Sequence, residues 1–323
     1  MADPILLSLG SINVDFQVRV DQPPDIGQTL LASDFVRLSG GKAANVAFLA
    51  KRLGLPARLL GRVGDDMLAE QALGPLRDAG VDLAGVSTAH GCATAVSMIA
   101  VLPDGKKSIV LANNSNDAWG DEDVRRVIAA IDEAPEGSVL VADYEVPPRV
   151  ARQAVRAAAE RGLLIVIDPS PASRVDHETL TYATAVTPNP VEAEGLTGIK
   201  VDGVEAAARA ARRLIARGIR SVCVKFADGG CLVARDSEMS VVAPVPVPVV
   251  DTTGAGDAFA GALAVALIEG RPLIEAASFA TAASHLAVTA FGSQPAYPSR
   301  HEIEKLWPAL LANTKTLVWQ AYA

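Results

Sequence analysis

Short strand-like runs alternate with amphipathic helical segments along most of this 323-residue chain. The strand-like runs are apolar and rich in β-branched residues, and they cover residues 5–9, 57–61, 138–142, 163–167, 185–187 and 221–226. Helical periodicity covers residues 42–53, 66–79, 121–131, 148–161, 203–217 and 272–289. Because each helix carries the chain back before the next strand, this order predicts an α/β fold with a mostly parallel sheet and helices on both faces.

Two regions break the alternation. Residues 13–20 with 29–38, and residues 93–102 turning into 106–112, resemble antiparallel strands without helices. They predict a small β-sheet lid, formed by strands within about 13–38 and 93–112, set on the main body. Such a sheet needs something against its apolar face, so we expect it to close over a ligand, to pair with a second copy, or both. No linker divides residues 1–323, which we expect to form a single domain.

Composition limits the classes of partner. A hydrophobic content of 50% supports a large core, and a net charge of −8 without any basic cluster argues against nucleic-acid or anionic-membrane partners. Residues 1–4 lead directly into a strand-like run, without a charged and apolar leader, and no apolar stretch has the length of a membrane helix. We therefore expect a soluble, cytoplasmic protein.

The cysteines and histidines show no metal-ligand spacing. The three cysteines form no C-x-x-C pair, which is typical of a reducing compartment, and each is predicted to fill a strand as a small apolar residue: Cys92, Cys223 and Cys231. The four histidines are interpreted as surface or packing residues, so no zinc site is predicted: His90, His177, His285 and His301.

The segment Asp251-Thr-Thr-Gly-Ala-Gly-Asp257 lies between two apolar runs. The preceding run, residues 241–250, contains several prolines and is interpreted as an edge strand, whereas the uncharged run 258–268 is interpreted as a buried helix. The small residues of the turn leave the first N–H groups of that helix uncovered. Because the helix dipole is positive there, the turn is predicted to hold an anion.

Asp257, at the start of this helix, has two interpretations. A carboxylate there is either an N-terminal cap or a general base beside a transferring phosphoryl group. The glycines of the turn and the second carboxylate, Asp251, favour the general base. The chain has no G-x-x-x-x-G-K-[ST] motif, and Gly254-x-Gly256 lacks the third glycine of a dinucleotide fingerprint, which disfavours a P-loop enzyme and a nicotinamide oxidoreductase.

A second glycine turn, Gly40-Gly41, opens the helix at residues 42–53. Lys42 and Asn45 lie on one face of its first turn, where a lysine opposes the helix dipole. Fixed donors there suit a hydroxyl-rich ligand, although a plain turn with a solvated lysine remains the alternative. Further polar residues follow strand-like runs, at the edge where open α/β sheets bind ligands: Asn13, Asp15 and Glu145.

Four motifs stand along the chain in this order: Gly10-Ser-Ile-Asn-Val-Asp15, Gly40-Gly-Lys-Ala-Ala-Asn45, Thr187-Pro-Asn-Pro-Val-Glu192 and Asp251-Thr-Thr-Gly-Ala-Gly-Asp257. Together they resemble the ribokinase-like (PfkB) carbohydrate kinases over nearly the whole chain. Within that family, the Gly-Gly-Lys start at Gly40 and the segment Asp168-Pro-Ser-Pro-Ala are more similar to the ribokinases than to the fructokinases or ketodeoxygluconate kinases.

The resemblance implies a role for each matching residue. Asp257 would be the general base, and the amides of the turn, Gly254, Ala255 and Gly256, would stabilise the transferring phosphoryl group. The residues implied to hold the sugar hydroxyls are Asn13, Asp15, Gly41, Lys42, Asn45 and Glu145. The residues implied to contact the nucleotide are Asn189, Lys225, Asp228, Gly230 and Thr281.

Two ions are also implied. Glu192 would bind Mg²⁺ through water, since Mg²⁺ keeps most of its water shell. A monovalent cation, expected to be K⁺, would lie among Asp251, Thr253, Ala287, Ala290 and Gly292. The chain departs from the family pattern at four positions, where the family more often has a small hydroxyl residue, a glycine or a polar residue: Lys225, Ala227, Phe291 and Ala296.

The implied activity is ATP-dependent phosphorylation of a primary hydroxyl of a small sugar. Ribose is the expected acceptor, with fructose, 2-keto-3-deoxygluconate or a nucleoside as alternatives. A sugar- or nucleotide-binding regulator without catalysis is a further alternative, and the intact Asp257 argues against it. The expected partners are the sugar, ATP with Mg²⁺, and a second copy of the chain bound through the lid.

Overall fold

The computed structural model describes residues 3–23 and 25–319. Its main sheet has ten strands in the order β14-β13-β12-β11-β10-β9-β8-β1-β4-β5. Their bounds are β1 (Leu6–Leu9), β4 (Ala57–Gly64), β5 (Asp82–Ala89), β8 (Val139–Ala142), β9 (Leu164–Ile167), β10 (Ala185–Val186), β11 (Ser221–Lys225), β12 (Cys231–Arg235), β13 (Glu238–Val242) and β14 (Thr314–Leu317). The strands from β5 to β11 pair in parallel, and β12 to β14 extend the sheet in antiparallel fashion.

Side chains of the central strands enter two separate cores. In β1, Leu6 packs on one face of the sheet, and Leu7 and Leu9 pack on the other. The alternation arises because successive residues of a strand point to opposite faces. A strand buried on both faces therefore reads as a continuous apolar run, as predicted for residues 5–9.

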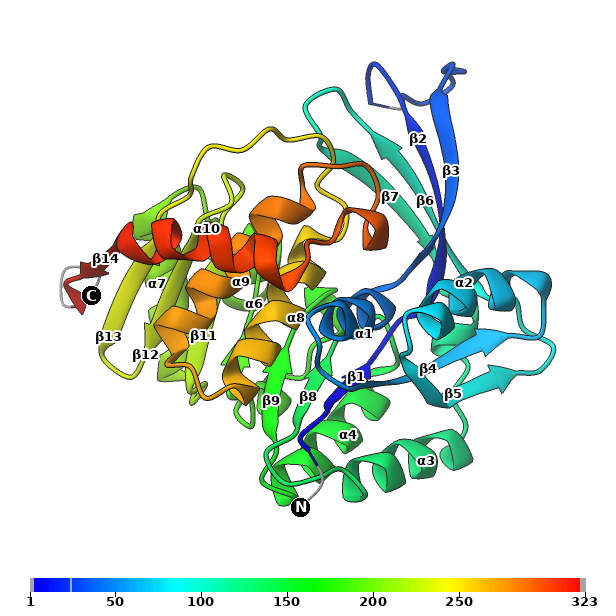
Figure 1. Cartoon of the computed structure of the whole chain (residues 1–323), viewed down its shortest axis with the longest axis horizontal. Helices are drawn as coiled ribbons and strands as arrows, with labels where there is room; N and C mark the ends of the chain where they lie inside the picture. The colour runs from blue at the N-terminus through cyan, green and yellow to red at the C-terminus, as the bar shows by residue number, and fades with distance from the viewer. Residues whose placement is uncertain (1–2, 24, 320–323) are drawn as a thin grey trace.

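Helices cover both faces of this sheet (Figure 1). The helices on the first face are α1 (Lys42–Arg52), α2 (Met67–Asp78), α8 (Ala255–Ile268), α9 (Leu273–Ala287) and α10 (Arg300–Ala312). Those on the second face are α3 (Asp121–Asp132), α4 (Pro148–Glu160), α5 (His177–Leu180), α6 (Pro190–Thr197) and α7 (Val204–Ala216). Three short 3₁₀ segments are η1 (Asn114–Asp117), η2 (Ala172–Arg174) and η3 (Gln294–Ala296). The predicted fold class is confirmed.

A second sheet of four strands projects from the main body (Figure 1). Its order is β3 (Ser33–Gly40), β2 (Asn13–Arg19), β6 (Ala95–Val101), β7 (Lys107–Ala112). The predicted antiparallel pairs, β2 with β3 and β6 with β7, are confirmed, whereas the central pair, β2 and β6, runs parallel. These two strands are separated in sequence by β3 and by α1, β4, α2 and β5 of the main body, whereas the antiparallel pairs are sequential neighbours. The β2–β3 pairing also contains a register shift between Gln17 and Arg19.

The predicted edge strand at residues 241–250 is wrong beyond Val242, where β13 ends. Pro244, Pro246 and Pro248 follow, and a proline lacks the N–H that a strand ladder needs. The chain instead crosses towards the cavity described below, and the edge of the main sheet on this side is β14. Helices α5, α6 and α10 and strands β5, β12 and β14 were not among the predicted elements, and β13 was predicted only in part.

The cysteine prediction is confirmed for Cys223 and Cys231, which are buried in β11 and β12. Cys92 differs, because it lies in a turn after β5 and is half-buried. Within residues 3–23 and 25–319, none of the helices is long and apolar enough to cross a membrane.

Candidate active site

A cavity of about 720 Å³ opens where the main sheet meets the small sheet. It collects residues from the starts of α1 and α8, from segments that follow parallel strands, and from one face of the small sheet. The predicted site residues that line it are Asn13, Asp15, Gly41, Lys42, Asn45, Glu145, Asn189, Glu192, Lys225, Asp228, Thr253, Gly254, Ala255, Gly256 and Asp257. The structure thus brings together residues that span most of the chain.

The turn before α8 exposes the first amides of that helix. Gly254 is its N-cap residue, with φ of 75°, and no side chain of residues 3–23 or 25–319 caps the amides, while the N–H of Ala255 donates over 3.4 Å to Thr252 O. A Cβ at Gly254 would lie 2.6 Å from Tyr297 Oη and 2.7 Å from Ser293 Cβ, so only glycine fits. Uncapped amides at the positive end of a buried helix form a site for an anion.

Asp257 does not cap this helix. Its carboxylate is instead held from α1: Asn45 Nδ2 donates to Asp257 Oδ2 over 2.8 Å, and Lys42 Nζ lies 3.5 Å from Asp257 Oδ1. Asp257 is only 7% exposed, yet it lines the cavity beside the uncapped turn. The geometry removes the capping interpretation and leaves a fixed carboxylate facing the place where an anion would sit.

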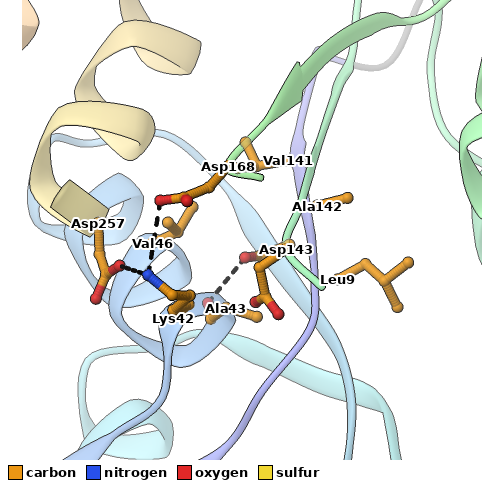
Figure 2. A pocket seen from close by; sticks show the side chains of 10 residues that line it. Leu9, Lys42, Ala43, Val46, Val141, Ala142, Asp143, Asp168 and Asp257 are labelled. Carbon is orange, nitrogen blue, oxygen red and sulfur yellow. Dashed lines mark hydrogen bonds and ion pairs between the residues drawn. The ribbon is translucent and has the colours of Figure 1, made fainter. Parts of the chain in front are cut away.

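Lys42 lies between two carboxylates, as Figure 2 shows. Besides Asp257, its ammonium lies 3.8 Å from Asp168 Oδ2, and Lys225 Nζ approaches the same oxygen at 3.6 Å. Burial opposes the charge of Lys42, but Asp168 and Asp257 raise its pKa well above the usual value. Burial likewise opposes the charge of Asp168, but Lys225 and Lys42 lower its pKa. Lys42 and Asp168 therefore both stay charged at neutral pH.

Asp168 was not predicted as a site residue. It directly follows β9, just as Glu145 follows β8, so the position of an acid after a parallel strand was the signal that could have found it. Its second oxygen, Oδ1, is buried without a hydrogen-bond partner among the described residues. Burying a carboxylate oxygen without a partner costs free energy unless a ligand or a water molecule donates a hydrogen bond to it.

A second acidic pair lies behind Lys42. Ser11 Oγ donates to Glu145 Oε2 over 2.6 Å, and the backbone N–H of Lys42 donates to Ser11 Oγ over 2.9 Å. Asp143, also missed in the sequence, accepts from the N–H groups of Ser11 and Glu145. Burial raises the pKa of both Asp143 and Glu145, and Glu145 further raises that of Asp143.

Asn13 and Asp15 project from β2 of the small sheet. Asn13 Nδ2 donates to Ser97 Oγ over 3.1 Å, while Asn13 Oδ1 accepts from Asn116 Nδ2 over 2.8 Å. Asn116 was not predicted, and its buried amide fixes the orientation of Asn13. Burial raises the pKa of Asp15 to about 7, and the charges of Asp257 and Glu145 act in the same direction.

The small sheet also contacts the turn before α8. Gly105, in the β6–β7 turn, accepts at its carbonyl oxygen from the backbone N–H and the hydroxyl of Thr252, over 3.1 and 2.9 Å. Lys107 Nζ donates to Thr252 O over 2.9 Å. These contacts close the sheet over the cavity on that side.

On the side of the cavity predicted to bind the nucleotide, Asn189 and Glu192 form a capping box at the start of α6. Asn189 Oδ1 accepts from the N–H of Glu192 over 2.9 Å, and Glu192 Oε2 accepts from the N–H of Asn189 over 2.8 Å. Burial and the nearby charge of Asp168 raise the pKa of Glu192. Glu192 lines the cavity and Asp168 Oδ1 is unpartnered, so this donor set fits a hydrated Mg²⁺.

Two predicted nucleotide contacts do not reach the cavity wall. Gly230 packs against Pro244, and the hydroxyl of Thr281 donates within α9 to Ala277 O. The α9 residues that do line the cavity are one to two turns further along: Ser284, His285 and Val288 at the end of the helix. His285, interpreted from sequence as a surface or packing residue, lies against Gly229, where a Cβ would be 2.8 Å from its ring.

The residues expected to bind a monovalent cation lie together but off the cavity wall, except Thr253. Asp251 is fully buried, and Val288 O accepts from its backbone N–H. Asp251 Oδ1 accepts from the N–H of Thr253, and Oδ2 accepts from the N–H of Gly292, each over 2.8 Å. Gln17 Nε2 donates to Oδ2 as well. The carboxylate therefore faces N–H groups on both oxygens.

Comparison with known proteins gives consistent matches. The family pattern described as pfkB family carbohydrate kinase matches residues 4–306. The ribokinase of Haemophilus influenzae is 32% identical over 297 residues, covering 92% of this chain and 96% of that protein. The deoxyribokinase of Salmonella typhi is 31% identical over 293 residues, covering 90% of this chain and 94% of that protein. The structure of Arabidopsis thaliana ribokinase complexed with ribose and ATP matches with a TM-score of 0.80 at 30% identity, covering 95% of this chain and 99% of that one.

The raised pKa of Asp15 predicts how sugar use depends on pH. If Asp15 binds the sugar, its ionised carboxylate accepts stronger hydrogen bonds from the hydroxyls than the protonated acid does, and Asp15 ionises as the pH rises through about 7. We expect kcat/KM for the sugar to rise about tenfold per pH unit below that value and then level off. Asp15→Asn should remove this inflection, measured at saturating ATP. The same inflection in Asp15→Asn would assign it to Asp143 or Glu145 instead.

Proposed function

The chain belongs to the pfkB family of carbohydrate kinases, and from this premise we propose that it transfers the γ-phosphoryl group of ATP to a primary hydroxyl of ribose. The observation that carries the proposal is the placement of Asp257, a fixed carboxylate that faces the cavity beside the uncapped turn of α8. Phosphoryl transfer requires a base or positioning group for the acceptor and preorganised donors for the phosphoryl oxygens. The Asp257 carboxylate and the first amides of α8, which line the same cavity, would supply these two parts.

The cavity wall around Asp257 suits a sugar. Asn13, Asp15 and Glu145 supply acceptors, whereas Lys42 and Asn45 supply donors. A small polyol needs such a mixture, because each hydroxyl both donates and accepts. Asp257 would take the proton of the attacked hydroxyl, and the contacts from Asn45 and Lys42 hold the carboxylate in place for that step.

The transferring phosphoryl group would lie over the turn before α8. The amides of Gly254, Ala255 and Gly256 would donate to its oxygens. Lys225 would add a positive charge beside these amides. Its Nζ lies 3.3 Å from the position that a Cβ on Gly256 would occupy. Asp168 holds this lysine in position, so the departure from the family pattern at Lys225 would put a cation where charge develops.

ATP and Mg²⁺ complete the proposed site. The metal, when bound, would neutralise phosphate charge through its water shell, with Glu192 and Asp168 as acceptors for those waters. The nucleoside would extend along the wall formed by Ala227, Asp228 and His285. An ATP-dependent sugar kinase with free thiols suits the cytoplasm, which we propose as its location.

Ribose is proposed on the names of the relatives, which include ribokinases and a deoxyribokinase. A coupled ADP-release assay across ribose, deoxyribose, fructose, 2-keto-3-deoxygluconate and nucleosides tests it. We expect kcat/KM for ribose to exceed each other acceptor by about tenfold or more, since loss of one hydroxyl contact costs at least that factor. A higher value for another sugar would reassign the acceptor, and no turnover with any of them would contradict the proposed function.

Asp257→Asn tests the general base. Asparagine has the same size and retains an oxygen that can accept from Asn45, but it cannot accept the hydroxyl proton. We expect kcat to fall by about 10²–10⁴-fold with little change in ATP affinity, measured by single-turnover kinetics and nucleotide binding. Turnover near that of the wild type would show that the proton leaves by another route.

We also propose a homodimer formed through the small sheet. Its outer face carries large apolar side chains in solvent: Phe35 is 60%, Met98 is 51% and Val110 is 62% exposed. Phe16 stacks on Phe35 with ring centroids 6.2 Å apart, so the apolar side chains form a surface across neighbouring strands. A contiguous apolar surface on a two-sided sheet is typical of an interface.

Met98→Glu tests this interface. Light scattering of the wild-type protein at micromolar concentration should give a dimeric mass, and Met98→Glu should shift it towards the monomer, because a carboxylate would be buried without a partner. Met67→Glu is the matched control, since Met67 is 91% exposed at the start of α2, on the main body. A monomeric mass for the wild type would contradict the proposed dimer.

A further inference from the structure

The environment of Asp251 does not fit the monovalent cation that the family resemblance implies. A cation site needs oxygen lone pairs directed at one point. Asp251 Oδ2 instead accepts from the amide of Gln17 and from the N–H of Gly292, and Oδ1 accepts from the N–H of Thr253. A cation at Oδ2 would meet the positive ends of two N–H dipoles.

These N–H groups already compensate the buried carboxylate. Asp251 is fully buried, and a buried carboxylate is stable only with donors or a counter-charge. Gln17 is also fully buried, and it comes from β2, a strand of the small sheet. The side-chain amide therefore reaches across from the lid to the segment that leads into the phosphate-binding turn.

A second contact from β2 covers the same loop. The Arg19 guanidinium lies 4.2 Å above the ring of Phe291, which directly precedes Gly292. Arg19 Nε also pairs with Asp34 on β3 at 3.3 Å. Ala296, further along the loop, has no polar side chain to offer an ion. The chain thus departs from the family pattern at the two loop positions that bear on ion binding, Phe291 and Ala296.

The orientation of the Gln17 amide decides between two arrangements. Its oxygen, Oε1, and the hydroxyl of Thr253 have no partner among residues 3–23 and 25–319. If the amide were reversed, Oε1 would face Asp251 Oδ2, and only a cation between the two oxygens would make that contact favourable. Ion dependence therefore separates the two arrangements directly.

We infer that the Gln17 side-chain amide takes the place of the monovalent cation. A protein group, rather than an ion, then sets the orientation of the phosphate-binding turn, and the enzyme works without K⁺. This rests on the proposed function for its catalytic readout. Gln17 is a positioning residue, acting on the turn through Asp251 and Thr253. The same contact links the lid strand that carries Asp15 to the turn that carries Asp257.

The first experiment uses the wild-type protein in potassium, sodium and tetramethylammonium chloride at equal ionic strength and fixed Mg²⁺. We expect sugar-dependent ADP formation to agree within about twofold among the three salts, and the midpoint of thermal unfolding to be the same in each. A rate or unfolding midpoint raised selectively by K⁺ would overturn the inference, because it would show an ion bound at the native protein.

The second experiment uses Gln17→Ala, which leaves Asp251 Oδ2 with the N–H of Gly292 and an open space. We expect turnover in tetramethylammonium chloride to fall about tenfold, the equivalent of one charged hydrogen bond, and K⁺ to restore it partly. The control is Gln22→Ala, a change at an exposed lid residue, which should behave as the wild type. If Gln17→Ala loses activity and K⁺ does not restore any of it, Gln17 has only a packing role and the inference is overturned.

Failure of the two proposals can be told apart. If no sugar is phosphorylated in any salt, the proposed function fails, and the unfolding midpoints of wild type and Gln17→Ala still decide the inference. The inference is supported if the unfolding midpoint of the wild type is the same in all three salts while that of Gln17→Ala rises selectively in K⁺. If Gln17→Ala does not fold, the wild-type salt series decides alone.

Discussion

The ammonium of Lys42 connects the parts of the molecule on which the site depends. It joins α1 to Asp257 of α8 and to Asp168 after β9, and Asp168 in turn holds Lys225 at the end of β11. A lysine in the first turn of a helix is unfavourable towards the helix dipole, so these carboxylates must offset that cost. Lys42 and Asp168 keep one another ionised, since each charge shifts the pKa of the other towards its charged form, and their ion pairs hold Asp257 and Lys225 in place around the turn before α8.

Much of the fold and part of the site could be predicted from the sequence, for identifiable reasons. The alternation of apolar runs and helical segments specifies the doubly covered sheet, and acids that follow parallel strands must gather at one edge. The parallel pairing of β2 with β6 was missed, because it depends on the main-body elements inserted between them. Asn116 and Gln17 were missed because their roles come from contacts 103 and 234 residues away in sequence, which no local spacing reports.

The lid strand β2 takes part in both halves of the proposed reaction. Asn13, Asp15 and Gln17 alternate along it, so all three point to the same face of the small sheet. Two of them line the cavity where we propose that the sugar binds, and the third donates to Asp251, which precedes the turn before α8. Because one strand carries both sets of contacts, a movement of β2 changes both. The position of the lid and the geometry of the turn before α8 are therefore coupled.

The two-residue period of side chains along β2 also limits where residues can be inserted or deleted in this part of the chain. Substitutions along the strand alter one contact at a time, but an inserted or deleted residue before Gln17 would rotate every later side chain to the opposite face. The register shift between Gln17 and Arg19 marks the point after which the pairing with β3 is already irregular. Length variation in related chains should therefore collect after Arg19, in the connection of residues 20–32, and be rare between Asn13 and Gln17.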